Sequence, residues 1–370
     1  MTAMRYDIAD RHRRIGVEPA SPSHFTLTNP QSCEAELALD PAWTLYCFDP
    51  ETDTALFVLT PPTDLSKAVF AYEVQFQTAT QALILPLDAI ADMANDLPQP
   101  EQVLLIFSTG RCGSTLFSRV LGAMPDVWSL SEPDAFTNLA MKGHTLPSAK
   151  IVNLLRAAVS LSFRPPSPFR IYAPKFRSEV FSQIPHYANS FPTATSCFLF
   201  RDLEGYADSS FRFTQRLGFQ MQDLTYPEAA ERWMMISVSP PEATLDVLVE
   251  DKAVPVGPEI FMAARWLERM EGGMIAAEAG LSPHLVSYRQ MTADPKSAFS
   301  PVLDACGIEP GAISQASDVF AQDSQAGSVA SGRSTEKGLS KTQKDNLRRL
   351  VTRTERFALV GAFFGPDAGL

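Results

Sequence analysis

The stretch Val103–Phe117, VLLIFSTGRCGSTLF, decides the fold predicted for this chain. Its apolar run, Val103–Phe107, predicts a fully buried strand, and the periodic apolar segment after Gly113 predicts a helix over Thr115–Ala123. A strand that passes through a glycine-containing loop into a helix is the geometry that binds phosphate. The glycines let backbone N–H groups turn toward the anion, and the helix N-terminus adds donors that have no partner in the helix. The sequence therefore predicts a phosphate-binding loop.

The side chains of this loop suit an anion, but they do not form the usual nucleotide-hydrolase motif. Arg111 brings a guanidinium group whose forked donors match phosphate or sulfate oxygens. Ser114 and Thr115 bring hydroxyl groups to the start of the helix. No Lys precedes Ser114, so the signature G-x-x-x-x-G-K-[ST] is not met. Cys112 is expected to be a small neutral filler rather than a reactive thiolate.

A second apolar run, Thr195–Phe200 (TSCFLF), predicts another buried strand, which ends in Arg201, and Ser209 follows eight positions later. The glycine loop and this strand–Arg–Ser pattern together resemble the sulfotransferase superfamily, whose members use 3'-phosphoadenosine-5'-phosphosulfate (PAPS). The resemblance implies that Arg201 and Ser209 bind the 3'-phosphate. It also implies that the 5'-phosphosulfate is bound by Gly110, Arg111, Cys112, Gly113, Ser114 and Thr115.

Further pieces are similar, in the same order, to the tyrosylprotein sulfotransferase-like branch of that superfamily. The tripeptides Pro125–Val127 (PDV) and Ser131–Pro133 (SEP) follow the loop as they do in that branch. The resemblance implies that Glu132 is the catalytic base. It also implies that Lys175, in IYAPKF, contacts the leaving group together with Arg111.

The segment Gly332–Ser340, GRSTEKGLS, resembles the part of that branch that closes over the cofactor. The resemblance implies a catalytic role for Ser334 and cofactor contacts for Arg333 and Lys337. A flexible polar loop is the alternative for this segment.

Other assignments also have alternatives. An arginine at the end of a strand can pair with a neighbouring carboxylate, here Asp202 or Glu204. Ser210 is the adjacent rival for the serine position, although the spacing favours its neighbour. His144 is the histidine placed plausibly for the histidine base of cytosolic-type sulfotransferases, but we favour Glu132.

Length and composition fit a globular enzyme. The chain has 370 residues, 45% of them hydrophobic, and a net charge of −11. A negative balance argues against nucleic-acid binding as the main activity, because a surface that follows phosphates needs a basic excess. We find no apolar run near the ~20 residues of a membrane span and no signal peptide. The five cysteines are scattered without metal-ligand spacing, so we expect reduced thiols, a cytoplasmic location and no metal.

The chain is predicted to divide at the linker Asp96–Gln102, DLPQPEQ, into a β-rich N-terminal module (1–98) and an α/β domain (99–370). In the module, turn-rich residues between Trp43–Phe48 and Ala55–Thr60 predict a hairpin. Lys67–Phe76 and Gln81–Leu85 are predicted to form a second hairpin.

Beyond the linker, strands alternate with helices, which predicts a central parallel sheet flanked by helices. The further strands are expected at Val127–Leu130, Phe169–Ala173 and His284–Ser287. The further helices are expected at Ile151–Leu161, Glu204–Leu217, Glu259–Glu278 and Lys341–Leu359. Long loops, typical of lids, are expected at Ser237–Gly257 and Asp318–Gly332.

The function implied by the resemblance is transfer of a sulfuryl group from PAPS to a hydroxyl or amine. The acceptor is expected to be a small molecule, lipid or sugar, because nothing marks the chain for a secretory compartment. We expect neither nucleic-acid binding nor stable membrane insertion. Two alternatives remain open: a P-loop-type kinase that uses ATP, and a non-catalytic nucleotide-binding or interaction protein.

Overall fold

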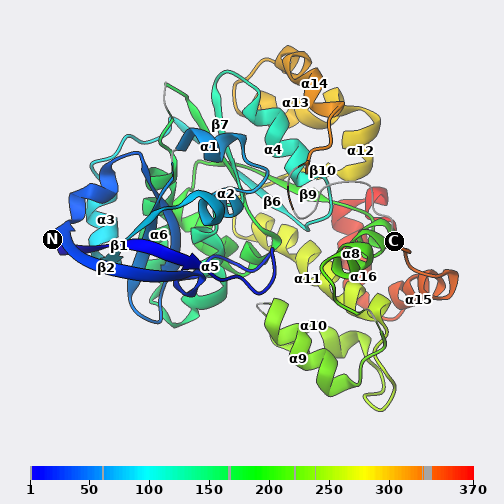
Figure 1. Ribbon diagram of the computed structural model, residues 1–370. Helices are drawn as coiled ribbons and strands as arrows, with labels where there is room; N and C mark the ends of the chain where they lie inside the picture. The colour runs from blue at the N-terminus through cyan, green and yellow to red at the C-terminus, as the bar shows by residue number, and fades with distance from the viewer. Residues whose placement is uncertain are drawn as a thin grey trace.

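The computed structural model describes residues 2–60, 62–165, 168–220, 222–237, 239–326, 328 and 336–370. Two five-stranded sheets organise this part of the chain (Figure 1). The first, near the N-terminus, is antiparallel with strand order β2-β1-β5-β4-β3, and the second is parallel with order β10-β9-β6-β8-β7. The predicted α/β fold, with a helix-flanked parallel sheet and a β-rich N-terminal part, is confirmed.

The strands of the antiparallel sheet are β1 (Thr2–Arg11), β2 (Phe25–Glu34), β3 (Trp43–Asp49), β4 (Thr54–Leu59) and β5 (Gln81–Pro86). The strands of the parallel sheet are β6 (Gln102–Ser108), β7 (Val127–Ser131), β8 (Ile171–Lys175), β9 (Thr195–Phe200) and β10 (His284–Ser287). The helices of the N-terminal part are α1 (Pro62–Lys67), α2 (Ala71–Thr78) and α3 (Leu87–Ala94). The helices that follow are α4 (Ser114–Gly122), α5 (Ala135–Lys142), α6 (Ser148–Ser162), α7 (Ile184–Ser190), α8 (Leu203–Arg216), α9 (Tyr226–Ile236), α10 (Pro241–Leu248), α11 (Pro258–Glu278), α12 (Tyr288–Ala293), α13 (Pro295–Ala305), α14 (Ser317–Phe320), α15 (Lys341–Val351) and α16 (Glu355–Phe364).

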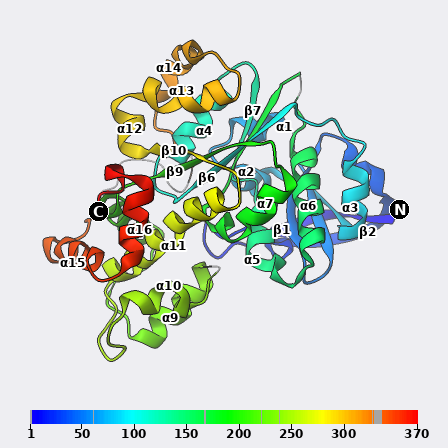
Figure 2. The same cartoon turned by 180° about the vertical axis from the view of Figure 1, so that it is seen from behind.

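Strand β6 lies in the middle of the parallel sheet and is covered on both faces. Leu104 and Ile106 belong to a buried cluster with residues of α4 and α13, whereas Leu105 and Phe107 belong to another cluster with residues of α11. Successive side chains of a strand point to opposite faces, so a continuous apolar run is what a doubly covered strand requires. Figures 1 and 2 show α4, α12 and α13 grouped on one side, apart from α6, α7 and α11.

The predicted hairpin of β3 and β4 is confirmed, but the predicted strand Lys67–Phe76 is wrong. This segment contains the end of α1 and most of α2, and the buried residues of α2 (Ala71, Tyr72 and Gln75) recur at helical spacing. Strand β5 pairs with β1 and β4 instead. Aromatic and β-branched residues favour strands only where their side chains can pack on the pleated surface of a sheet. In this segment they pack from a helix instead.

Three predictions for the C-terminal half also need correction. The helix expected over Lys341–Leu359 is two helices, α15 and α16, and the Thr354 hydroxyl caps the second by accepting the Arg356 N–H. The loop expected at Ser237–Gly257 contains α10, which begins with a proline, a residue suited to the first turn of a helix. The loop expected at Asp318–Gly332 starts within α14, and its end lies outside the described residues.

The two sheets share a hydrophobic core. Trp43, Phe57 and Leu83 of the antiparallel sheet belong to the same buried cluster as Phe107 of β6 and Phe136 of α5. The predicted division between residues 98 and 99 therefore separates the two sheets, but it does not separate two cores.

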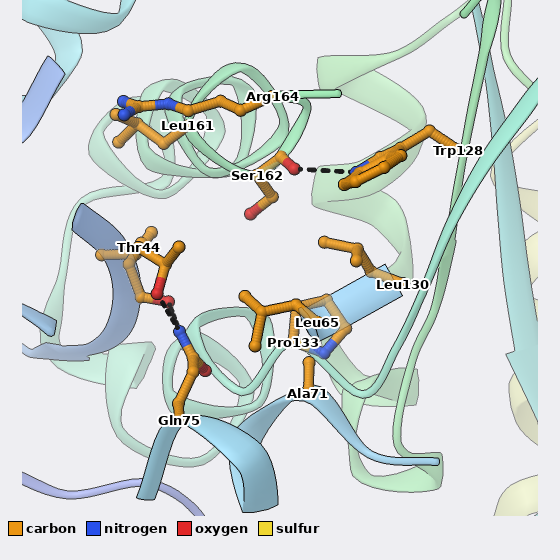
Figure 3. A pocket seen from close by; sticks show the side chains of 11 residues that line it. Thr44, Leu65, Ala71, Gln75, Trp128, Leu130, Pro133, Leu161, Ser162 and Arg164 are labelled. Atoms are coloured by element: carbon orange, nitrogen blue, oxygen red, sulfur yellow. Dashed lines mark hydrogen bonds between the residues drawn. The ribbon is translucent and has the colours of Figure 1, made fainter. Parts of the chain in front are cut away.

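A cavity of about 20 Å³, enough for one water molecule, lies at this junction (Figure 3). On its N-terminal side, the Gln75 amide donates to the Thr44 hydroxyl at 2.9 Å. On its other side, the Arg164 guanidinium donates to the Asp40 carbonyl at 3.0 Å, which ties the end of α6 to the N-terminal part.

The longest described helix, α11, has 21 residues and lies largely buried. Its buried face includes the charged residues Glu268 and Arg269, so it is not a uniformly apolar helix. No helix among the described residues is long and apolar enough to cross a bilayer.

His24 is a buried titratable group that fastens the antiparallel sheet. Its side chain is 2% exposed, its Nδ1 lies 2.7 Å from the Tyr46 hydroxyl, and its ring packs edge-on against Phe76. Burial, and secondly the nearby Arg13 guanidinium, lower the pKa of His24 from 6.5 to about 4. The folded protein therefore holds His24 neutral over a pH range in which the unfolded chain would protonate it.

We predict that His24 makes folding less favourable as the pH falls from 7 to 4.5. The unfolded state binds more protons in this window, so the free energy of unfolding should fall by about 2–3 kcal/mol through this group. Urea denaturation at both pH values, on the wild type and on His24→Gln, isolates the contribution because the other groups titrate in both proteins. An identical pH dependence of the two proteins would contradict the assignment.

Candidate active site

The predicted site residues gather at one edge of the parallel sheet, where its strands end. β6 ends at Ser108 before the glycine loop, β7 at Ser131 before Glu132, and β9 at Phe200 before Arg201. Lys175 is itself the last residue of β8. In open α/β sheets, the crevice outside the carboxyl ends of the strands is where ligands bind.

The glycine loop has the backbone of an anion-binding nest. Gly110, Arg111 and Gly113 all have positive φ, at 75°, 54° and 79°. Gly113 is the N-cap of α4 and has no side chain to cap the helix, so that position supplies no acceptor for the N–H groups of the first turn. Left-handed residues and uncapped helix N–H groups together form a concave set of donors for an anion.

Left-handed backbone occurs at two of the predicted catalytic residues, Arg111 and Glu132. Among the described residues, five that are not glycine have positive φ, and Arg111 and Glu132 (φ 55°) are two of them. Such a conformation typically costs about 1–3 kcal/mol and persists where the surroundings enforce it, frequently at functional sites.

Arg111 joins the loop to α8. Its Nε donates to the Ser209 hydroxyl at 3.2 Å, and its guanidinium stacks over the Phe213 ring at 4.5 Å. Burial, followed by the nearby cations Arg201 and Arg216, lowers the pKa of Arg111. The predicted serine is thus the one that touches Arg111, whereas Ser210 lies on the buried face of α8.

Arg201 lies beside Arg111 with little compensation for its charge. Its Nη1 donates to the Arg111 carbonyl at 3.4 Å, and its guanidinium lies 4.5 Å from the Tyr288 ring centre. Within the part of the chain that the structure describes, its buried Nε has no hydrogen-bond partner. The nearest carboxylate oxygen, in Asp202, is 4.0 Å from Nε. A buried donor without a partner is costly, so this arrangement suits an anionic ligand.

Of the neighbouring carboxylates, the alternative partners of Arg201, Asp202 forms a long ion pair with Arg201 and is shared with α8, whereas Glu204 is engaged elsewhere. Asp202 caps α8 by accepting the Gly205 N–H at 2.6 Å. Glu204 pairs with Lys344 and Arg348 of α15, at 3.1 and 2.9 Å.

Arg269 is a buried residue that the sequence analysis missed. From α11 it donates to the Thr109 carbonyl at 3.3 Å, to the Tyr206 hydroxyl at 2.5 Å and to Glu179 at 2.8 Å. It therefore fixes the start of the glycine loop against α8. A charged residue inside the apolar pattern Phe261–Met270 was the available signal.

Glu132 and Lys175, predicted separately, are in direct contact. Lys175 is 1% exposed, and its ammonium pairs with Glu132 Oε1. The Glu132 N–H donates to the Lys175 carbonyl at 2.7 Å. Arg177 Nε lies 3.8 Å from the other carboxylate oxygen, Oε2.

Aromatic side chains connect the two groups of site residues. Phe70 lies against the Lys175 ammonium, 5.5 Å from ring centre to Nζ, and packs with Tyr72 and Phe213 in one cluster. Phe213 in turn covers Arg111. The N-terminal part of the chain therefore supplies part of the wall between the glycine loop and Glu132.

Three predicted loop residues differ in their surroundings. The Cys112 side chain is fully buried in the core below the loop, so any contact with an anion would come from its backbone. Ser114 and Thr115 stand at the start of α4, and within the described residues their hydroxyls have no hydrogen-bond partner.

Two further predicted residues that the structure describes, His144 and Lys337, have exposed side chains. His144 is exposed in the turn after the far end of α5. Lys337 has an exposed side chain, and its carbonyl accepts from Gln215 at the end of α8 (3.0 Å). Arg333 and Ser334 lie outside the described residues, so their roles stay predictions.

A scan against protein-family models and a search of curated proteins each found no match. Solved structures that are similar include a sulfotransferase from Alicyclobacillus acidocaldarius, with 11% identity, a TM-score of 0.43, and coverage of 72% of this chain and 96% of that chain. A sulfotransferase domain from the curacin biosynthetic pathway has 11% identity, a TM-score of 0.39, and coverage of 72% and 98%. Retinol dehydratase in complex with androsterone and the inactive cofactor PAP has 13% identity, a TM-score of 0.38, and coverage of 85% and 97%. At these TM-scores and identities, the function has to be argued from the site.

We predict that Gly113→Ala impairs anion binding, whereas Gly218→Ala does not. Both glycines have positive φ, so each alanine should lower the free energy of unfolding by about 1–2 kcal/mol. A Cβ at Gly113 would also lie 2.4 Å from Met291 Cε and 3.0 Å from Tyr288 Cδ2, whereas none of the described atoms lies within 4 Å at Gly218.

Titration calorimetry with adenosine 3',5'-bisphosphate checks this prediction. Gly113→Ala should lose affinity, and Gly218→Ala should match the wild type. Equal affinity of all three proteins would show that the loop is not the anion site.

Proposed function

We propose that this chain is a PAPS-dependent sulfotransferase. The observation that carries the proposal is the placement of Arg111 and Arg201 side by side near the strand ends. The buried Nε of Arg201 has no hydrogen-bond partner among the described residues. Like charges in a poorly hydrated site repel each other, and a bound anion relieves this repulsion. A nucleotide with phosphate groups at its 3' and 5' positions suits two adjacent cations and a nest of backbone donors.

The donor would supply an activated sulfuryl group whose bond to a phosphate oxygen breaks as a bond to the acceptor oxygen or nitrogen forms. The chain has to bind the donor and meet the negative charge that develops on the departing phosphate. Arg111 and the loop N–H groups are placed for the 5' end, and Arg201 with Ser209 for the 3'-phosphate. Arg333, Ser334 and Lys337 are proposed to act in the same site, as the family resemblance implies.

Glu132 is proposed as the general base that takes the proton of the acceptor. Its carboxylate is held by Lys175 on one oxygen and faces Arg177 on the other, and 15% of its side chain is exposed. Lys175 lies at the end of the strand next to β6, which also suits contact with the leaving group. We propose a hydroxyl or amine of a small molecule, lipid or sugar as the acceptor and a cytoplasmic location.

We predict that recognition depends on the 3'-phosphate. Adenosine 3',5'-bisphosphate should raise the melting temperature without metal, while AMP should bind about 10- to 100-fold more weakly, because hydrogen bonds to a charged group are worth about 1.5–3 kcal/mol. Thermal shift and calorimetry measure both. Arg201→Ala should remove the preference, whereas Arg289→Ala, an 80% exposed arginine in α12, should keep it. Equal binding of the two nucleotides by the wild type would contradict the assignment of Arg201 and Ser209.

We predict that Glu132→Gln lowers sulfuryl transfer by at least about 10²-fold. Glutamine keeps the shape of the side chain but cannot accept the proton, and positioned bases contribute about 10²–10⁴-fold in rate. Affinity for the bisphosphate should change little. Turnover of ³⁵S-labelled PAPS checks this, with His144→Ala as the comparison that should stay active. A Glu132→Gln protein as active as the wild type, or loss of activity in His144→Ala alone, would refute the assignment.

A further inference from the structure

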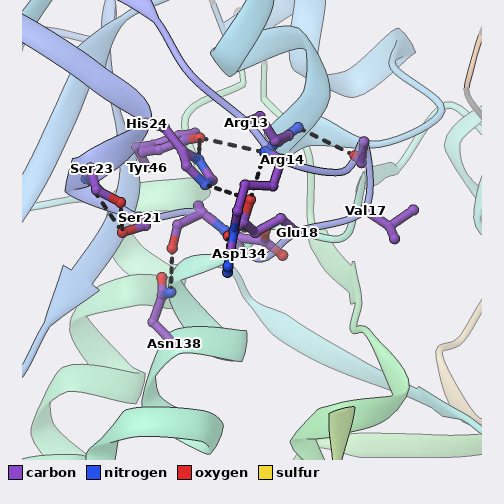
Figure 4. Close-up of polar contacts among 12 residues, drawn as sticks. Arg13, Arg14, Val17, Glu18, Ser21, Ser23, His24, Tyr46, Asp134 and Asn138 are labelled. Carbon is purple, nitrogen blue, oxygen red and sulfur yellow. Dashed lines mark hydrogen bonds and ion pairs between the residues drawn. The ribbon is translucent and has the colours of Figure 1, made fainter. Parts of the chain in front are cut away.

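The segment between β1 and β2 docks its backbone beside Asp134 and Asn138, shortly after Glu132 in the sequence (Figure 4). The Val17 carbonyl accepts from Arg177 Nη1 at 2.8 Å. The Ala20 N–H donates to Asp134 Oδ2 at 2.8 Å, and the Ala20 carbonyl accepts from the Asn138 amide at 2.7 Å. Residues far apart in the sequence thus meet through three directional bonds.

Arg177 and Asp134 form the buried ion pair at the centre of this contact. Arg177 Nε and Nη2 donate to the two carboxylate oxygens at 2.5 and 2.8 Å, the forked geometry that guanidinium and carboxylate groups prefer. Asp134 is fully buried, and the Arg177 guanidinium stacks 3.9 Å from the centre of the Tyr72 ring. Burial raises the pKa of Asp134, and Arg177 opposes this effect.

Asp134 also lacks the capping hydrogen bond that is usual for an aspartate at the start of a helix. It is the N-cap of α5, where an aspartate normally accepts an N–H of its own helix, but it makes no such side-chain bond. Its carboxylate serves Arg177 and Ala20 instead.

Two parallel contacts result. Lys175 pairs with Glu132. Two residues further along each of these two segments, Arg177 pairs with Asp134. Arg177 Nε also lies 3.8 Å from Glu132 Oε2. The left-handed backbone at Glu132 is therefore held between two ion pairs. Among the described contacts, it is the second pair that is hydrogen-bonded to residues 17–20.

We propose that Arg177 is a positioning residue for Glu132 and that residues 17–20 complete the active site by fixing Arg177 and Asp134. The inference rests on the proposed function, because it concerns the placement of Glu132, the proposed base. It assigns Arg177 no contact with the donor or the acceptor. Its consequence is that the N-terminal module belongs to the catalytic machinery and is not an independent attachment. A shift of the base by about 1 Å is enough to lower a rate about 10²-fold.

Arg164 provides a matched control. Like Arg177 it is 9% exposed and donates to a backbone carbonyl of the N-terminal part, here that of Asp40. It lines the cavity at the junction of the two sheets and has no described contact with Glu132. A purely structural role would make the two arginines equivalent.

The experiment compares Arg177→Met, Arg177→Lys, Asn138→Ala and Arg164→Met with the wild type. Release of ³⁵S from labelled PAPS, with water and with p-nitrophenol as acceptors, gives kcat and the KM for PAPS at a temperature where each protein is folded. We expect Arg177→Met to lose about 10²-fold in kcat with KM within about twofold. Arg177→Lys should recover part of kcat, and Arg164→Met should keep kcat despite a lower melting temperature.

Asn138→Ala keeps every charge and removes only the hydrogen bond to the Ala20 carbonyl. It therefore tests the inference even if Arg177→Met does not fold. It should lower kcat less than Arg177→Met, and hydrogen exchange should rise together in residues 13–24 and 131–138. Unchanged kcat in both Arg177→Lys and Asn138→Ala, or an equal loss in Arg164→Met, would overturn the inference. A wild type that neither binds the bisphosphate nor releases label would instead contradict the proposed function.

Discussion

Two arginine side chains brought together in a poorly hydrated site set the main constraint on this molecule. Arg111 and Arg201 come from different strand ends, and the Arg201 guanidinium donates to the Arg111 carbonyl. The protein offsets their repulsion only partly, by stacking them on Phe213 and Tyr288 and by bonding Arg111 to Ser209. Such an arrangement carries unfavourable electrostatic energy, which the polyanionic donor proposed above would relieve on binding.

A second group of charges, around Glu132, is balanced in a different way. Each carboxylate there has a cationic partner, and the cations stand on aromatic rings contributed by the N-terminal part. Among the described residues, the two arginines of the first region therefore have less carboxylate compensation than the cations around Glu132. This difference suits a site in which a donor brings anionic groups to one side and a less charged acceptor approaches the other.

The sequence was sufficient to predict the parallel sheet, because its strands are short apolar runs that can be recognised from neighbouring residues alone. It also placed Arg111, Arg201, Glu132 and Lys175 at or just after the ends of such strands, where the structure has them, while their roles stay predictions. It could not predict that β5 pairs with β1, or that 67–76 is helical, because distant partners decide both. The role of Arg269 depends on a carbonyl 160 positions earlier in the chain, which no local pattern encodes.

The docking of Ala20 has a consequence for the order of folding. Its partners lie 114 and 118 positions ahead, and the partner of Val17 lies 160 positions ahead. Contacts that close such long loops form late, because the chain loses conformational entropy before the contacts contribute favourable free energy. On the ribosome, the turn that bears Glu132 would therefore stay incomplete until β8 has emerged. Residues 17–20 are thus synthesised well before the partners that complete their contacts.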